Sequence, residues 1–306
     1  MRLSRLSKVD LHLLQVFVSV VKAQGFSAAQ VSLNVSTSTI SRQIADLELR
    51  LGMRLCQRGR VGFRLTDKGQ LVYNAALKLF ASLEEFSGTI EGSRGKLVGQ
   101  LSLAVIDNWI TNPEASIVPV LAKFCMAAPD VHIELHSLAP DDIEYSVLDG
   151  HITIGIGVFH NHKPGLLYQQ ISSEFMGLYC GRGHPLFEIS DPQEEERLLQ
   201  AANLAKRAYL SEEKVAPVSI GLKSTANAHQ VESVALLVLT GNFVGYLPES
   251  YAHPWVVEGR MKKVLDGKYD LPTNIEIVTK RGSKLNLVAR TFLKYVGEET
   301  GTDSCP

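Results

Sequence analysis

Short hydroxyl side chains and one arginine lie close together between residues 36 and 42. Hydroxyls donate and accept hydrogen bonds, and an arginine can form a two-pronged contact with a guanine edge or with a phosphate. Side chains this short near the start of a helix would let its backbone approach the floor of the DNA major groove. We therefore predict DNA contacts for five residues: Ser36, Thr37, Ser38, Ser41 and Arg42. The sequence leaves open whether Arg42 contacts a base or a phosphate.

The segment that carries these residues has the pattern of a short amphipathic helix. Four apolar residues recur at offsets of 4, 7 and 11 and so fall on one helical face: Ile40, Ile44, Leu47 and Leu51. Ser36 can cap the start of this helix by accepting a hydrogen bond from a backbone N–H. Gly52 follows where helices often end in the left-handed region. We expect the apolar face to pack inward.

Two further helices are expected upstream. The first has an apolar face and is ended by the Gln24-Gly25 pair; that face comprises Leu11, Leu14, Phe17, Val18 and Val21. Ser27 is expected to cap a second, short helix with the sequence AAQVSL. Asn34-Val35 then supplies the turn, which completes a helix-turn-helix.

A basic hairpin is expected after the third helix. Four arginines surround a turn that contains Gly59 and Gly62: Arg54, Arg58, Arg60 and Arg64. Arginines at the edge of a DNA-reading unit usually bind phosphates, and Arg58 and Arg60 are our candidates.

The charge of the chain is unevenly distributed. Residues 1–69 hold 11 Lys and Arg against 4 Asp and Glu, a net charge of +7, whereas residues 70–306 hold 20 against 28, a net charge of −8. Positive charge gathered on a helix-turn-helix fits a polyanionic partner, because neutralised phosphates release counterions. A solvated basic surface without a partner is the alternative.

Residues 9–69 resemble the winged helix-turn-helix of LysR-type transcriptional regulators. The residues that carry the resemblance are Ser36, Ser38, Ile40-Ser41-Arg42-Gln43-Ile44, Leu47-Glu48, Leu51-Gly52, Leu55, Arg58 and Leu65-Thr66-Asp67-Lys68-Gly69. The sequence departs from the family at Thr37-Ser38, where Gln-Pro or Gln-Ser is frequent, and at Cys56, where Phe is usual. A match over about 60 residues is far more specific than one short motif. The resemblance implies sequence-specific binding to double-stranded DNA.

A long helix is expected after the wing, capped by Thr66 and running from about Asp67 to Ile90. Its apolar stripe comprises Leu71, Ala75, Leu79, Leu83, Phe86 and Ile90. A helix of this length cannot bury such a stripe alone, so we predict a homo-oligomer, a dimer or a tetramer, formed through it. The resemblance also implies dimerisation here. The alternative is that the helix folds back on its own domain. Gly92, Gly95 and Gly99 then indicate a hinge.

The rest of the chain has strand and helix patterns in alternation, which predicts an open α/β sheet with parallel pairing. Strands are expected at 101–106, 131–138, 151–158, 171–180, 207–210, 218–224, 242–247 and 275–279, and helices at 119–126, 143–148, 231–240 and 285–296. This region resembles the LysR effector-binding domain, a two-lobed α/β fold like that of periplasmic solute-binding proteins. The fragments that carry this resemblance include Leu148-x-Gly150-x-Ile152 and Gly183-His184-Pro185-Leu186.

The predicted domains follow from these patterns. They are an all-α-rich winged helix-turn-helix over residues 1–66, a linker helix and hinge over 67–94, and an effector-binding domain over 95–306. Lobe I is expected at about 95–166 plus 269–300 and lobe II at about 167–268.

Small ligands in open α/β sheets bind outside the carboxyl ends of strands. We predict that a small-molecule effector binds there between the lobes, with Asn108 and Thr111 as hydrogen-bonding groups and Trp109 as an apolar wall. Across the cleft we expect Tyr209, Ser211, Asn227, His229 and Gln230. Each of these polar residues could equally be a helix cap.

The sequence offers no pattern typical of catalysis. It has no glycine-rich phosphate loop, no G-x-S-x-G and no H-E-x-x-H, so we predict neither an enzyme nor a cofactor. His160 and His162 lack further nearby ligands, which favours an exposed loop over a metal site, and Glu194-Glu195-Glu196 is expected to be a solvated run. Cys125 and Cys180 lie in apolar contexts, which favours burial over redox chemistry.

The sequence shows neither an apolar run of membrane-spanning length nor a signal peptide at its start, which predicts a cytoplasmic protein. We therefore predict a DNA-binding transcriptional regulator that responds to an effector and acts on RNA polymerase. The rival hypothesis is a solute-binding or catalytic α/β protein whose N-terminal helices mediate protein contacts.

Overall fold

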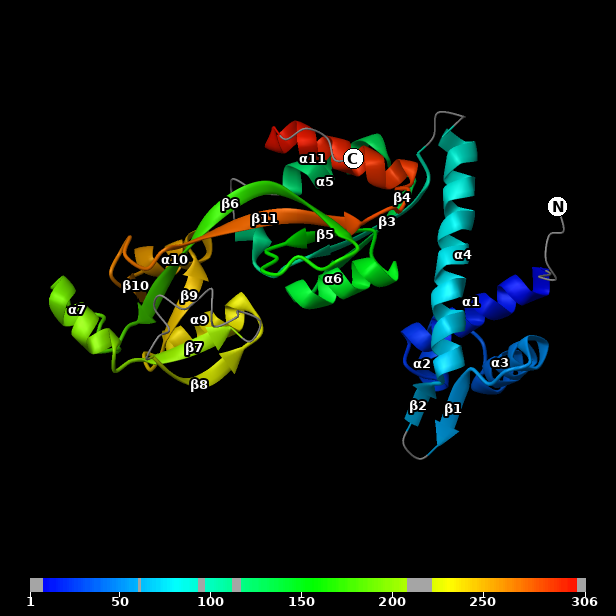
Figure 1. Cartoon of the computed structure of the whole chain (residues 1–306), viewed down its shortest axis with the longest axis horizontal. Helices are drawn as coiled ribbons and strands as arrows, with labels where there is room; N and C mark the ends of the chain where they lie inside the picture. The colour runs from blue at the N-terminus through cyan, green and yellow to red at the C-terminus, as the bar shows by residue number, and fades with distance from the viewer. Residues whose placement is uncertain (1–7, 60–61, 93–96, 112–116, 208–221, 302–306) are drawn as a thin grey trace. The chain divides into compact units, whose positions relative to one another are not determined.

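The computed structural model describes residues 8–59, 62–92, 97–111, 117–207 and 222–301. The chain forms two compact units, residues 1–87 and 88–306. The first unit begins with three helices, α1 (Lys8–Lys22), α2 (Phe26–Leu33) and α3 (Thr37–Leu51) (Figure 1). An antiparallel hairpin of β1 (Cys56–Gly59) and β2 (Gly62–Leu65) follows, and then the long helix α4 (Asp67–Gly92). The predicted helix-turn-helix and wing are confirmed.

Local signals in the sequence place the ends of these helices. The Ser36 hydroxyl accepts a hydrogen bond from the backbone N–H of Thr39 at 3.2 Å, and Gly52 ends α3 with a φ of +66°. The turns before α2 and α3 use left-handed residues, Gln24 and Asn34. The prediction that Ser27 caps this helix is wrong, because α2 begins at Phe26, two residues before the predicted start, and Gly25 is its N-cap residue. The Phe26 ring packs edge-on against Phe63 of the wing at a centroid distance of 5.8 Å.

The core of the first unit joins all of its helices. The inward face of α3 is buried as predicted, with Ile40, Ile44 and Leu47 at most 1% exposed. Helix α1 is buried over a wider arc than its predicted face, since Leu13, Val16 and Val20 are also buried. The reason is that α4 belongs to the same core through Tyr73 and Ala76, and the rings of Phe17 and Tyr73 lie 6.4 Å apart.

Helix α4 therefore has two apolar faces. Tyr73 and Ala76 pack on the first unit, whereas most of the predicted stripe remains exposed: Leu71 is 70%, Leu83 42%, Phe86 65% and Ile90 43% exposed. The helix does pack on its own unit, but through a face that the sequence pattern did not single out. The stripe itself is left on the surface.

The second unit begins with β3 (Gly99–Val105), the short 3-10 turn η1 (Trp109–Thr111), α5 (Val118–Ala127), β4 (Val131–Ser137), α6 (Pro140–Asp149) and β5 (Ile154–Gly157). The long strand β6 (Leu166–Gly181) leads into a second lobe that comprises α7 (Pro192–Leu199), β7 (Asn203–Arg207), β8 (Lys223–Ala228), α9 (Val231–Leu239), β9 (Val244–Pro248), α10 (Glu249–Val257) and β10 (Met261–Lys263). The chain returns along β11 (Leu271–Lys280) and ends in α11 (Leu287–Thr300).

The sheet of this unit is mixed, with the strand order β4-β3-β5-β11-β6-β9-β7-β8 and β10 beside β6. Parallel pairing was predicted, and it holds for β3 with β4 and β5 and for β7 with β8 and β9. It is wrong for β6 and β11, which pair antiparallel with each other and with their other neighbours. These two strands carry the chain into the second lobe and back, so they must run in opposite directions.

We call the part around β3, β4 and β5 lobe I and the part around β7, β8 and β9 lobe II. Lobe I has apolar cores on both faces of its strands, one with Phe124 of α5 and Phe292 of α11 and the other with Ile143 of α6 (Figure 1). Lobe II has its own cores, around Leu204 and Val234. Both crossings between the lobes lie inside the continuous strands β6 and β11. The two-lobed α/β fold is confirmed.

Several elements differ from the predicted segments. Helices α7 and α10 and strand β10 were not predicted; they are only three to nine residues long, which leaves little room for a periodic pattern. Strands β7 and β8 overlap the predicted strands at 207–210 and 218–224 only at Arg207 and at 223–224; residues 208–221 lie outside the described part of the chain.

No single helix among the described residues is long and apolar enough to cross a membrane, and α1 and α2 meet the length and composition criteria only as a pair bent by 120°.

Candidate nucleic-acid interface and ligand cleft

Helix α3 presents the predicted polar residues on its outer side. Ser36, Ser38 and Arg42 are exposed, and Thr37 and Ser41 are half-buried. The Ser36 hydroxyl lies 2.9 Å from the hydroxyls of both Ser38 and Thr39, in addition to its bond with the backbone of Thr39. Ser36 therefore organises the start of the helix, and Ser38 and Arg42 are exposed residues that follow it on α3.

Polar contacts fix α3 to its surroundings. The Glu48 carboxylate accepts hydrogen bonds from the backbone N–H groups of Leu55 and Cys56, at 2.7 and 3.1 Å, and so holds the first strand of the wing against the helix. Arg50 donates to Asp10 of α1 at 3.2 Å. A helix held at both sides can present its outer face in a fixed orientation, which binding to base edges requires.

The wing carries exposed arginines beside this helix. Arg54 precedes β1, Arg64 lies in β2 opposite Gln57, and both are exposed. The predicted residue Arg60 lies outside the described residues. Arg58 is paired with Phe63 in the hairpin, and its side chain is also outside the described part. Their phosphate contacts stay a prediction.

In the second unit the carboxyl ends of the strands meet between the lobes. A small cavity there, of about 20 Å³, is lined by Asn108 and His160 of lobe I, by Arg207 of lobe II and by Glu174 and Met176 of β6, with Ile106, Pro140, Val158 and Pro248 around them. We call it the deep hollow. Its volume is close to that of one water molecule.

A larger cavity lies next to the deep hollow. It has a volume of about 760 Å³ and is lined by residues 158–162, by Met176, by residues 271–274 at the start of β11 and by Glu276. We call it the side hollow. Val158, His160 and Met176 line both hollows, so the two are neighbours. Cavities of this size accommodate small organic ligands.

The predicted effector residues are only partly brought together. Asn108 lines the deep hollow, in a left-handed conformation with a φ of +60°. The Thr111 hydroxyl donates to the backbone oxygen of Asn108 at 2.7 Å, which is a capping contact. Trp109 is 6% exposed and packs in the core of lobe I, so it does not form an open wall.

On the side of lobe II, Asn227, His229 and Gln230 are exposed, and Asn227 lies within β8. Tyr209 and Ser211 lie outside the described residues. The effector contacts of these five residues stay predictions.

Two charged residues at the cleft were missed. Arg207, the last residue of β7, is 7% exposed, and its guanidinium lies 3.8 Å from the carboxylate of Asp107, which follows β3 in lobe I. A second oxygen of Asp107 accepts a hydrogen bond from the backbone N–H of Val231 at 2.5 Å. The sequence could have indicated Arg207 only if the strand had been predicted to end there. The predicted strand began at Arg207 instead.

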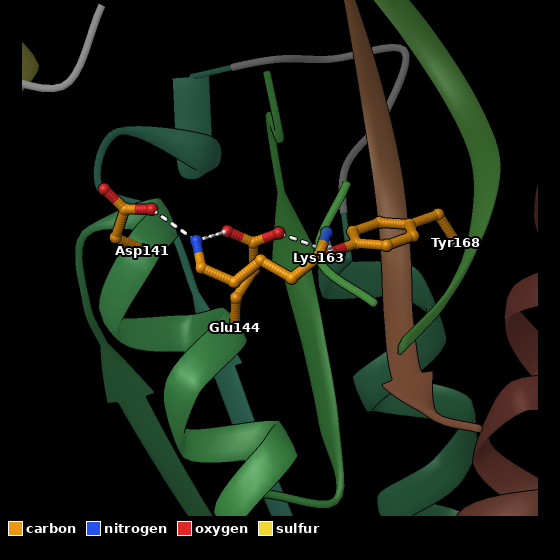
Figure 2. Close-up of polar contacts among 4 residues, drawn as sticks. All are labelled: Asp141, Glu144, Lys163 and Tyr168. Carbon is orange, nitrogen blue, oxygen red and sulfur yellow. Dashed lines mark hydrogen bonds and ion pairs between the residues drawn. The ribbon is translucent and has the colours of Figure 1, made fainter. Parts of the chain in front are cut away.

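An ionic network around the buried Glu144 supports the loop that lines both hollows (Figure 2). The Lys163 ammonium lies 2.5 Å from Glu144 and 2.6 Å from Asp141 of α6, and the Tyr168 hydroxyl donates to Glu144. The Tyr168 hydroxyl in turn accepts a hydrogen bond from the Lys163 backbone N–H at 2.8 Å. His162 stacks on Tyr168 and lies 3.0 Å from Glu276.

The environment fixes the protonation of this network. Burial and then the hydrogen bond to Glu144 raise the pKa of Tyr168 far above that of a free phenol. Burial acts to lower the pKa of Lys163, but hydrogen bonds to Asp141 and Glu144 outweigh it and the net pKa is raised. At neutral pH the network therefore holds a cationic lysine and a neutral tyrosine.

Other acidic residues have structural partners. Glu249, Asp266 and Asp270 are close enough together to hold a cation, but the ammonium of Lys263 already contacts all three. The prediction of a solvated run at 194–196 is wrong for Glu195, which is buried and bonds Lys262 and the backbone of Leu265, because α7 turns that side inward.

The two central cysteines differ. Cys125 is exposed, contrary to the prediction, because it lies on the outer side of α5. Cys180 is buried as predicted, and its burial raises the pKa of the thiol to about 12. The Cys180 thiol is therefore protonated at neutral pH.

Two family models match the chain over most of its length. The model described as "Bacterial regulatory helix-turn-helix protein, lysR family" matches residues 11–70, and the one described as "LysR substrate binding domain" matches residues 94–301. The chain belongs to the LysR family of transcriptional regulators.

Curated relatives of this LysR-type regulator match it from end to end. The "HTH-type transcriptional activator BauR" of Pseudomonas aeruginosa is 38% identical over 294 residues, which is 96% of this chain and 96% of BauR. The "HTH-type transcriptional regulator PtxR" of the same organism is 25% identical and covers 98% of this chain and 96% of its own length.

Solved structures of LysR-type regulators share the fold. Full-length CbnR "complexed with the target DNA complex" has a TM-score of 0.64 at 20% identity and covers 95% of this chain and 99% of that chain. Full-length LysG from Corynebacterium glutamicum "with bound effector Arg" has a TM-score of 0.55 at 15% identity and covers 95% of this chain and 97% of that chain. The protein is thus a LysR-type transcriptional regulator with a helix-turn-helix DNA-binding domain and an effector-binding domain.

Proposed function

We propose that α3 of this regulator lies in the major groove of double-stranded DNA and that Ser38 and Arg42 contact base edges or phosphates. The observation that carries the proposal is the exposure of these residues on a helix capped at both ends. Thr37 and Ser41 flank them, and the wing arginines Arg58 and Arg60 contact the phosphates alongside.

The Arg42→Ala variant tests this placement. We expect it to weaken specific DNA binding about tenfold or more, because one arginine contact to a base or phosphate is lost. The measurement is fluorescence anisotropy at several salt concentrations, with genomic fragments that bind the wild-type protein. Arg197→Ala, an exposed arginine of lobe II, is the matched control and should bind normally.

Unchanged affinity of Arg42→Ala would show that the reading surface lies elsewhere. If the wild-type protein shows no saturable, salt-sensitive binding, the rival hypothesis of a solute-binding or catalytic protein gains support.

We further propose that an effector binds between the lobes, in the side hollow and the adjoining deep hollow. Asn108 and Arg207 supply a polar amide and a buried positive charge there. The relatives carry the names of transcriptional regulators, and we propose that this chain also acts without catalysing a reaction.

A thermal-shift screen of metabolites against the full-length protein tests the effector proposal. A ligand that binds only the folded state stabilises it by about 2.7 kcal/mol at 100 times its dissociation constant, so its melting temperature should rise by several degrees. The hit should also change the affinity for DNA or the size of the DNA site. A ligand that raises the melting temperature equally when Asn108 is replaced by alanine would lie outside the cleft.

The exposed stripe of α4 supports assembly into a dimer or a tetramer. Pairing through Leu83, Phe86 and Ile90 would bury side chains that are each more than 40% exposed in one chain. Two recognition helices would then enter successive major grooves, about 34 Å apart. We propose that this assembly works in the cytoplasm and that effector binding changes its arrangement on DNA and its contact with RNA polymerase.

A further inference from the structure

We propose that Asp107 is a latch that holds the two lobes of the effector-binding domain together. Asp107 follows β3 in lobe I, and both of its carboxylate contacts are with lobe II. One is the hydrogen bond from the backbone N–H of Val231 at 2.5 Å, and the other is the pairing with Arg207 at 3.8 Å. We call these two contacts the Asp107 latch. They join residues that are 124 and 100 positions apart in the sequence.

Helix α9 depends on this contact for its N-terminus. Its own N-cap residue, Gln230, is extended and makes no side-chain capping hydrogen bond. Helix starts usually take a cap from the residue just before them, because the first backbone N–H groups have no partner inside the helix. Here a carboxylate from the opposite lobe does this, and its negative charge also suits the positive end of the helix.

Arg207 is the second partner that holds the Asp107 carboxylate in place. Its side chain is 93% buried, at the end of β7, and β7 pairs with β8, which leads directly into α9. Separating the lobes would take Asp107 away from both the helix start and this buried guanidinium. Moving a carboxylate away from a buried guanidinium is costly, because it removes a favourable charge interaction from a poorly hydrated place.

The deep hollow is the space between the lobes that the Asp107 latch keeps small. Its volume of about 20 Å³ leaves no space for an organic molecule between Asn108 of lobe I and Arg207 of lobe II. Through this hollow, as the described residues line it, a ligand group would reach Arg207 only after the lobes have moved apart. The latch therefore stabilises the closed arrangement and competes with any anionic group that approaches the same cation. This regulatory meaning rests on the proposed effector site, whereas the latch itself does not.

Chemical access to the deep hollow tests the latch. The parent protein for this test carries Pro140→Cys. Pro140 is buried, lines the deep hollow and is the first residue of α6, where its missing N–H is not needed by the helix. Alkylation at position 140 by iodoacetamide is measured by peptide mass spectrometry in the full-length protein. The exposed native Cys125 serves as the internal standard.

When Asp107→Ala is added, we expect alkylation at position 140 to become about tenfold faster, because the lost charge-assisted hydrogen bond raises the population of the open arrangement by about that factor. Alkylation of Cys125 should be unchanged. Asp130→Ala, an exposed aspartate of lobe I, is the matched control and should have no effect. Adding formate should slow the alkylation again in Asp107→Ala only, because the small anion occupies the position of the lost carboxylate.

Asp107→Asn keeps the shape and an oxygen acceptor but not the charge, and an intermediate rate is expected from it. If Asp107→Ala melts near room temperature, Asp107→Asn replaces it in the alkylation test. Equal alkylation rates in the parent protein and in the Asp107 variants would overturn the latch, as would an acceleration that Asp130→Ala reproduces. The experiment uses neither DNA nor effector, so its failure is distinguishable from failure of the proposed function.

Discussion

Replacing Phe86 with glutamate should convert the protein to a monomer and weaken its binding to DNA about 100-fold or more, since linked binding to two half-sites exceeds single-site binding by factors of this order. Phe86 is 65% exposed on α4, in line with Leu83 and Ile90. In a paired stripe, a charged side chain at this position would be buried among apolar groups and without a partner. Each recognition helix would then contact DNA alone.

Sedimentation velocity and fluorescence anisotropy on the same samples check this prediction. Ala81→Glu is the control: it adds the same charge to an exposed position of α4, about 140° round the helix from Phe86 at 100° per residue. It should stay oligomeric and bind DNA as the wild type does. An oligomer of wild-type size in Phe86→Glu would place the subunit contact elsewhere.

Replacing Lys163 with methionine should destabilise the second unit by about 3 kcal/mol, the lower end of the range for a buried charge that loses its partner. Glu144 is 3% exposed, and Lys163 supplies the cation 2.5 Å from its carboxylate. Without that cation, the carboxylate keeps only the Tyr168 hydroxyl as a partner in Figure 2. The melting temperature should fall by about 6–12 °C for a unit of this size.

Differential scanning fluorimetry with two further variants checks the cause. Lys123→Met removes the same side chain from an exposed pair with Glu299 at 2.5 Å and should leave the melting temperature nearly unchanged. Glu144→Leu combined with Lys163→Met should recover most of the loss, because a buried pair can be replaced by apolar groups. If the double variant melts no higher than Lys163→Met, the loss comes from the loop and not from the unpaired carboxylate.

The DNA-reading unit was predictable because its signals are local. Ile40, Ile44 and Leu47 share a face through the repeat of the helix itself, and Ser36 and Gly52 mark its ends within a few residues. The error at Ser27 occurs where a distant contact is present: α2 begins at Phe26, whose ring contacts Phe63, 37 positions away. A local cap preference could not include that contact.

The linker helix α4 has one face that the sequence pattern predicted and one that depends on a distant contact. Its length and its exposed stripe were apparent from the spacing of Leu83, Phe86 and Ile90. Its second face, Tyr73 and Ala76, looked unremarkable in sequence because those residues are recognised as core only when α1 lies against them. Burial of one face therefore depended on a partner element that periodicity does not reveal.

The structure has a hollow at the strand ends where the effector cleft was predicted, and its effector role stays a prediction. Asn108 lines this hollow and follows the first strand, as the sequence indicated. Arg207 was expected at the start of a strand but ends β7, and Asp107 was not predicted as a site residue. Trp109 was expected to face a ligand and instead fills the core of lobe I.

The sequence by itself determined the winged helix-turn-helix, the long linker helix and the alternation of strands and helices in the effector-binding domain, because these follow from side-chain spacing and end signals within one or two turns of chain. Only the tertiary structure decided that Asp107 meets Val231, that Lys163 neutralises Glu144 and that β6 and β11 run through both lobes. Those contacts depend on which distant segments pack together, and the free energy of burying a charge or an apolar face is set by the partner it meets there.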